Sequence, residues 1–114
     1  GNVSGNVNMA DRDIIFNNES NNLKSVEELI EKIITLVESN SGEIELEHKE
    51  SLIDDLHTIE EQSKSNSPSL FKIKKALGGI TTVLTFIPKG IEWGQKLLDS
   101  SQELINTIIN MFHL

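Results

Sequence analysis

The stretch Ser-Val-Glu-Glu-Leu-Ile-Glu-Lys-Ile-Ile-Thr-Leu-Val, residues 25–37, decides the fold class of this 114-residue chain. Its apolar residues recur at spacings of three and four, which places them on one face of an α-helix. They are Val26, Leu29, Ile30, Ile33, Leu36 and Val37. Ser25 and Glu28 form a Ser-x-x-Glu capping box in front of this stripe, a common signal for a helix start. The pattern predicts an amphipathic helix over residues 25–39.

Two further helices are predicted over residues 43–65 and 68–87. The inward face of the second helix consists of Ile44, Leu52, Ile53, Leu56 and Ile59. The inward face of the third consists of Leu70, Ile73, Leu77, Ile80, Leu84 and Ile87. Ser67 is expected as the N-cap of the third helix, with Pro68 at its first position, where the missing N–H costs nothing. Gly78 and Gly79 each cost about 1 kcal/mol relative to Ala inside a helix, so we expect a close helix crossing there.

A fourth helix is predicted over residues 89–112. A heptad repeat of apolar residues marks its seam: Ile91, Leu98, Ile105 and Phe112. Such a seam is typical of a helical bundle or coiled coil, so these four residues are also candidates for self-association. The sequence thus predicts a mainly α protein, a bundle of about four helices over residues 23–114.

The first 22 residues have a different pattern. Val3, Val7 and Met9 stand at odd positions between small polar residues, and the apolar run of residues 14–16 includes Ile14 and Phe16. Alternation of this kind predicts short strands or a hairpin, although the same composition also fits a polar tail. Two short strands alone are marginally stable in water, so they need a partner. We therefore expect residues 1–22 to be a strand-forming oligomerisation segment.

A family resemblance supports this expectation. Residues 3–14, Val-Ser-Gly-Asn-Val-Asn-Met-Ala-Asp-Arg-Asp-Ile, resemble stretches that adjoin helical domains in bacterial conflict and signalling proteins. These include the amyloid-signalling motifs compared with the RHIM of necroptosis. The resemblance implies strands that stack between chains through Asn ladders and Val/Ile zippers. We expect a finite homo-oligomer and not a fibril, because the acidic helices would repel one another along an unlimited stack.

Charge and composition exclude several classes of function. Residues 1–67 hold five basic and fifteen acidic residues, a net charge of −10, whereas residues 68–114 have a net charge of +2. We expect the two acidic helices to cover the two C-terminal helices. A chain this acidic lacks the basic surface patch of a nucleic-acid-binding protein. No nucleic-acid partner is therefore expected. The absence of Cys favours a reducing, cytoplasmic location, with the membrane surface as an alternative.

The residues that could carry chemistry form no catalytic set. Glu45 and His48, and Asp54 and His57, have the three-residue spacing of carboxylate-bridged metal sites, but both pairs fall on one predicted helix. Such sites need matching pairs on two facing helices, so a solvated acidic face is the preferred interpretation. With no nucleophile in a recognisable setting, we expect no enzyme activity and no cofactor.

A second candidate interaction surface lies in residues 70–112. Its members combine basic and apolar side chains: Leu70, Phe71, Lys72, Lys74, Lys75, Phe86 and Trp93. This combination resembles a membrane-surface helix, although such stripes are more often core.

The preferred function is a self-associating interaction or signalling module of a bacterial or phage defence system. The alternatives are a membrane-perturbing effector that uses residues 70–112, and a structural fragment of a larger protein.

Overall fold

The regular elements of residues 6–114 are all helical. The computed structural model describes the backbone of residues 6–114 and the side chains of residues 22–114. The elements are α1 (Asn6–Ser39), a 3-10 turn η1 (Ser41–Glu43), α2 (Leu46–Lys64), α3 (Leu70–Leu84) and α4 (Glu92–Phe112). The mainly helical bundle predicted from the sequence is confirmed.

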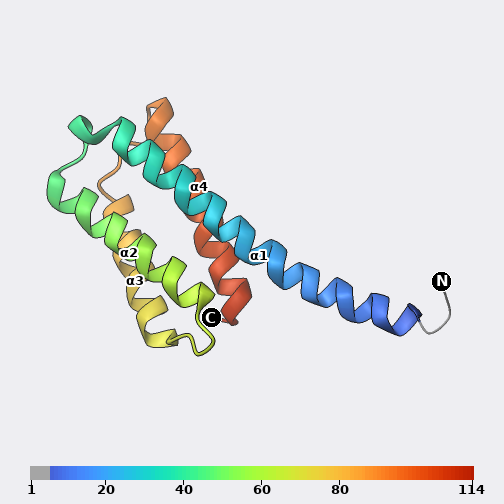
Figure 1. Cartoon of the computed structure of the whole chain (residues 1–114). Helices are drawn as coiled ribbons and strands as arrows, with labels where there is room; N and C mark the ends of the chain where they lie inside the picture. Colours follow the sequence, from blue (N-terminus) through green and yellow to red (C-terminus); the bar gives the residue numbers. More distant parts are fainter. Residues whose placement is uncertain (1–5) are drawn as a thin grey trace.

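The helices run alternately up and down, and they pack chiefly in two pairs (Figure 1). α1 lies along α4, and α2 lies along α3, while the contact between α3 and α4 is small. Each acidic helix therefore covers one of the two C-terminal helices, as the charge distribution predicted.

One core joins the four helices. Its fully enclosed large side chains come from every helix: Ile33 from α1, Leu52, Leu56 and Ile59 from α2, Ile73 and Ile80 from α3, and Leu97, Leu104 and Ile108 from α4. The apolar periodicity of the sequence correctly identified most of these positions. Burying a side chain of this size contributes about 1.5 to 3 kcal/mol, so the core is the main source of the bundle's stability.

The start of the first helix differs from the prediction. Residues 22–24 are already helical, so Ser25 lies inside α1 and does not cap it. The predicted end is confirmed, because α1 ends at Ser39. The side-chain amide of Asn40 donates to the carbonyl of Leu36 (2.8 Å), which satisfies one of the last carbonyls of the helix.

The predicted strand segment, residues 1–22, is not tested by the structure. Residues 1–5 lie outside the described residues altogether, and of residues 6–21 only the backbone is described, as part of α1. The side chains of five predicted self-association residues therefore lie outside the described part of the chain: Val3, Val7, Met9, Ile14 and Phe16. The strand and the hairpin stay predictions.

The second and third helices begin later than predicted. Residues 41–43 form η1 and Ile44 is extended, so α2 starts at Leu46 and not at residue 43. The N-cap of α3 is Ser69, whose hydroxyl accepts from the backbone N–H of Lys72 (3.2 Å), and not Ser67. Gln62 explains this choice, because its side-chain oxygen accepts from the backbone N–H of Ser69 (2.7 Å) and ties the helix start to α2.

The segment between α3 and α4 is longer than predicted. α3 ends at Leu84 and not at residue 87, and α4 begins at Glu92 and not at residue 89. Ile87 is buried in this link, which anchors it to the core. The chain then folds back over the first turn of α4, where a Cβ on Gly94 would collide with the carbonyl oxygen of Pro88. Only a glycine fits this close approach.

At the Gly-Gly pair, where a close crossing was predicted, one member is in contact with α2. A Cβ on Gly79 would meet the carboxyl group of Asp55, so the Asp55 side chain lies directly against Gly79. A Cβ on Gly78 would meet nothing within 4 Å. Gly78 is exposed, so the crossing gives no reason for a glycine at that position.

Candidate functional site

The predicted self-association seam of the fourth helix is used largely within the chain. Ile105 is buried, and Leu98 and Phe112 are half-buried against the core. Ile91 is 43% exposed and precedes α4 as an extended N-cap residue, so it does not lie on the helical seam. Trp93, assigned to the predicted membrane or partner face, is half-buried against the core. In the described chain α4 packs mainly against α1, and of the four predicted residues Ile91 is the most exposed.

The apolar residues of the third helix divide into a core face and an exposed face. Ile73, Ile80 and Val83 are buried, which confirms the interpretation of this stripe as core. Leu70 is 46% exposed and Phe71 is 75% exposed, so for these two residues that interpretation is wrong.

The outward side of α3 gathers the predicted basic residues into one surface, named here the α3 outer face. All its members are exposed: Leu70, Phe71, Lys72, Lys74, Lys75, Gly78, Thr81, Thr82 and Thr85. At 100° per residue most of them fall on the side opposite the core residues, while Leu70 and Lys72 flank the core face on its two sides. The sequence identified its N-terminal half, whereas the threonines were missed because they carry no hydrophobic signal.

The hydroxyl groups of these threonines are satisfied within the helix. Thr81 donates to the carbonyl of Leu77 (2.8 Å), and Thr82 donates to the carbonyl of Gly78 (2.9 Å). Thr85 donates to the carbonyl of Thr82 (2.6 Å). The C-terminal half of the α3 outer face therefore has no hydroxyl donor left for a partner.

The three lysines of this face make no ion pair within 4 Å with any residue of the described chain. Burial, and to a smaller extent the charge of Asp54, raises the pKa of Asp55 above its ordinary value. The charge of Lys75 acts in the opposite direction and is outweighed. α3 itself contains no acidic residue, so its basic charge stays open to a partner.

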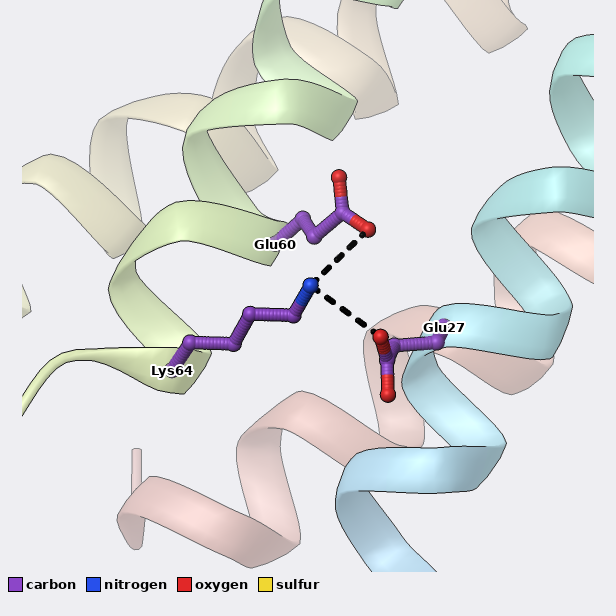
Figure 2. Close-up of polar contacts among 3 residues, drawn as sticks. All are labelled: Glu27, Glu60 and Lys64. Atoms are coloured by element: carbon purple, nitrogen blue, oxygen red, sulfur yellow. Dashed lines mark ion pairs between the residues drawn. The ribbon is translucent and has the colours of Figure 1, made fainter.

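Other lysines are engaged in joining helices, as Figure 2 shows for Lys64 at the end of α2. Its amino group lies 3.1 Å from a carboxylate oxygen of Glu27 on α1 and 3.6 Å from one of Glu60. The hydrogen bond to Glu27 is the main cause that raises the pKa of Lys64, followed by the negative charges of Glu27 and Glu60. This exposed cluster links α1 to α2 on a side of the bundle rich in carboxylates.

The two histidine pairs do not meet. The imidazole of His48 stacks on the ring of Phe86, with 4.3 Å between ring centroids and 20° between planes. The two rings help line a pocket of about 200 Å³ together with Glu43, Ile44, Glu45 and Ile87. His57 instead borders a groove between α1 and α2. Phe86 is 60% exposed, yet one of its faces is covered by His48, a contact that the sequence did not indicate.

The described residues form neither a metal site nor a membrane-spanning helix. Among them no group of three or more His, Asp or Glu side chains is placed to hold a metal ion. No helix in the same part of the chain is both long enough and apolar enough to cross a membrane.

Comparisons of this chain with protein-family models, with curated proteins and with solved structures found no match.

Proposed function

We propose that this chain is a non-enzymatic, self-associating interaction module, in which residues 1–22 join chains and the four-helix bundle is the body that they carry. The resemblance of residues 3–14 to bacterial signalling motifs favours a role in a bacterial or phage defence system. The partner is a second copy of the chain, and the product is a finite homo-oligomer.

One observation carries this proposal: the backbone of α1 begins well before the part of the helix that contributes to the described core. Among the described side chains of α1, the first buried one is Val26. Figure 1 shows the N-terminal half of α1 extending past the other helices, with no helix of the same chain beside it. No helix of the same chain is therefore at hand to pair with this stretch of backbone, and the proposal assigns that role to a second copy of the chain.

The composition of this segment makes strand pairing between chains feasible. Gly, Asn, Ser and Val are weak helix formers, each less favourable than Ala by roughly 0.5 to 1 kcal/mol. Unwinding the helical backbone that the single chain shows from Asn6 onward therefore costs little free energy. Strands from several chains would satisfy their backbone groups mutually and bury Val3, Val7 and Met9 on one face.

Size-exclusion chromatography with light scattering tests the proposal. The full chain should have a mass several times that of one chain, and residues 23–114 alone should be monomeric with an unchanged far-UV spectrum. In the full chain, Ile14→Lys with Phe16→Lys should also give a monomer. A matched control is Leu46→Lys, which changes a residue 66% exposed on the bundle and should leave the oligomer intact. A monomeric full chain would refute self-association.

The bundle counts against the membrane-perturbing alternative. Inserting residues 70–112 into a bilayer would require exposing core residues such as Ile73, Leu97 and Leu104, which are fully buried. Exposing each of them would cost about 1.5 to 3 kcal/mol of burial free energy, until contact with lipid replaced the lost burial. The folded chain offers a membrane only the side chains that are already exposed.

A further inference from the structure

We propose that the α3 outer face is a docking surface for anionic lipid headgroups, so that the folded bundle rests on a membrane without entering it. This goes beyond self-association, because it assigns a ligand class to a surface that lies apart from residues 1–22. It differs from the membrane-perturbing alternative, because every residue involved is already exposed.

Local charge is the first reason. Lys72, Lys74 and Lys75 lie within one turn of helix, and α3 has no acidic residue. Although the chain has a net charge of −8, its acidic residues are concentrated on other helices. Asp55 on α2 lies near enough to Lys75 for the two charges to interact, but none of the three lysines makes an ion pair within 4 Å with a described residue. Charges more than about 8 Å away are largely screened at physiological salt, so a surface that approaches the outward side of α3 responds mainly to the charges nearest to it. Basic residues beside a membrane favour anionic lipids.

Exposed apolar side chains beside the lysines are the second reason. Phe71 is 75% exposed and Leu70 is 46% exposed, and both lie in the first turn of α3 among the basic residues. An aromatic and an aliphatic side chain can enter the boundary between headgroups and acyl chains while lysines contact phosphate groups. A purely electrostatic contact would not need Phe71 to be open to solvent.

The hydrogen-bond donors of the α3 outer face fit a lipid surface better than a protein partner. Protein interfaces carry about one hydrogen bond per 100 to 200 Å². The threonine hydroxyls of this face already donate to their own helix, so beyond the lysines the face offers few donors. A lipid surface does not require such bonds.

The size of the face points the same way. A helix of 15 residues is about 22 Å long and presents a strip about 10 Å wide, roughly 220 Å². A stable protein interface buries about 800 Å² on each partner, so this strip alone is too small for a second copy of the chain. For peripheral lipid contact the strip needs only to place its lysines and Phe71 against headgroups.

Vesicle co-sedimentation with the full chain tests the proposal, using vesicles of phosphatidylcholine alone or mixed with phosphatidylserine. The chain should sediment with the mixed vesicles only, and less at high salt. Combining Lys72→Gln, Lys74→Gln and Lys75→Gln should weaken binding on the order of one hundredfold, about fivefold per lysine. Phe71→Ser should weaken it by about tenfold.

Matched control variants separate this face from general charge and hydrophobicity. Combining Lys24→Gln, Lys32→Gln and Lys96→Gln removes the same number of exposed charges elsewhere, and Leu46→Ser removes an exposed apolar side chain from α2. Both controls should bind mixed vesicles nearly as well as the unchanged chain, and all variants should keep its far-UV spectrum.

Three outcomes would overturn the proposal. The first is no sedimentation with either vesicle, and the second is equal loss of binding in the lysine variant and its control. The third is a lysine variant that changes the mass in light scattering without affecting sedimentation, which would assign the face to contact between copies of the chain.

Discussion

Replacing Gly78 and Gly79 with Ala, one at a time, tests the α2–α3 crossing on which the position of the α3 outer face depends. The two glycines are adjacent in the same helix, and neither has a positive φ. In the sequence they are equivalent. They differ only in what a new methyl group would meet.

The structure gives opposite expectations for the two variants. A Cβ on Gly78 would meet nothing within 4 Å, so Gly78→Ala should stabilise the bundle by about 1 kcal/mol, the helix preference of Ala over Gly. A Cβ on Gly79 would lie 3.0 Å from Cγ of Asp55 and closer to one carboxylate oxygen. Asp55 would have to leave its rotamer, which costs about 0.5 to 1.5 kcal/mol and cancels the gain.

Urea unfolding followed by far-UV circular dichroism measures the difference. Gly78→Ala should move the midpoint upward with an unchanged slope, and a gain of this size should raise Tm by roughly 4 to 8 °C in a small domain. Gly79→Ala should be neutral or destabilising. In an Asp55→Ala background, which removes the colliding carboxyl group, Gly79→Ala should recover about 1 kcal/mol of stabilisation.

Equal stabilisation by Gly78→Ala and Gly79→Ala would refute this reasoning, since it would mean that α2 does not approach α3 at Gly79. The same conclusion would follow if Asp55→Ala left the effect of Gly79→Ala unchanged. Either result would also remove the basis for the assigned orientation of α3.

Three other substitutions have defined outcomes. Gly94→Ala should destabilise by about 1 to 3 kcal/mol in urea unfolding, because the methyl group meets the backbone carbonyl of Pro88, which cannot rotate away. Asp55→Asn should stabilise at neutral pH in urea unfolding. Burial raises the folded-state pKa of Asp55 above 3.8, so the carboxylate costs stability at neutral pH. The difference between Asn and Asp should shrink as pH falls through the folded-state pKa and vanish below 3.8. An Asn variant whose advantage grew in acid would contradict this. Leu104→Ala should cost about 2 to 5 kcal/mol, whereas Ile109→Ala, at a position 38% exposed, should cost much less, as thermal melts would show.

Most of the core could be predicted from apolar periodicity. Ile33, Leu52 and Leu56 were assigned to inward faces and are fully buried. Helix boundaries were predicted less well, because competing local signals are equivalent in sequence. Ser67 and Ser69 can both cap a helix, and only the position of Gln62 on α2 selects Ser69.

The candidate surface could be predicted only in part. The lysines beside Leu70 and Phe71 were visible as a basic, apolar cluster, but the stripe that contained them was interpreted mainly as core. The contact with α2 selects a core face slightly rotated from the predicted one, with Ala76 and Val83 buried and Leu77 and Leu84 only half-buried. Leu70 and Phe71 are left outside this contact.

The sequence by itself determined that the chain forms amphipathic helices, because spacings of three and four place apolar residues on one side whatever the helix packs against. It also determined the division between an acidic half and a slightly basic half. The tertiary structure alone decided which edge of each apolar stripe is covered, since that depends on neighbours distant in sequence. Gly78 and Gly79 show the same limit, because only the contact with Asp55 on another helix distinguishes them.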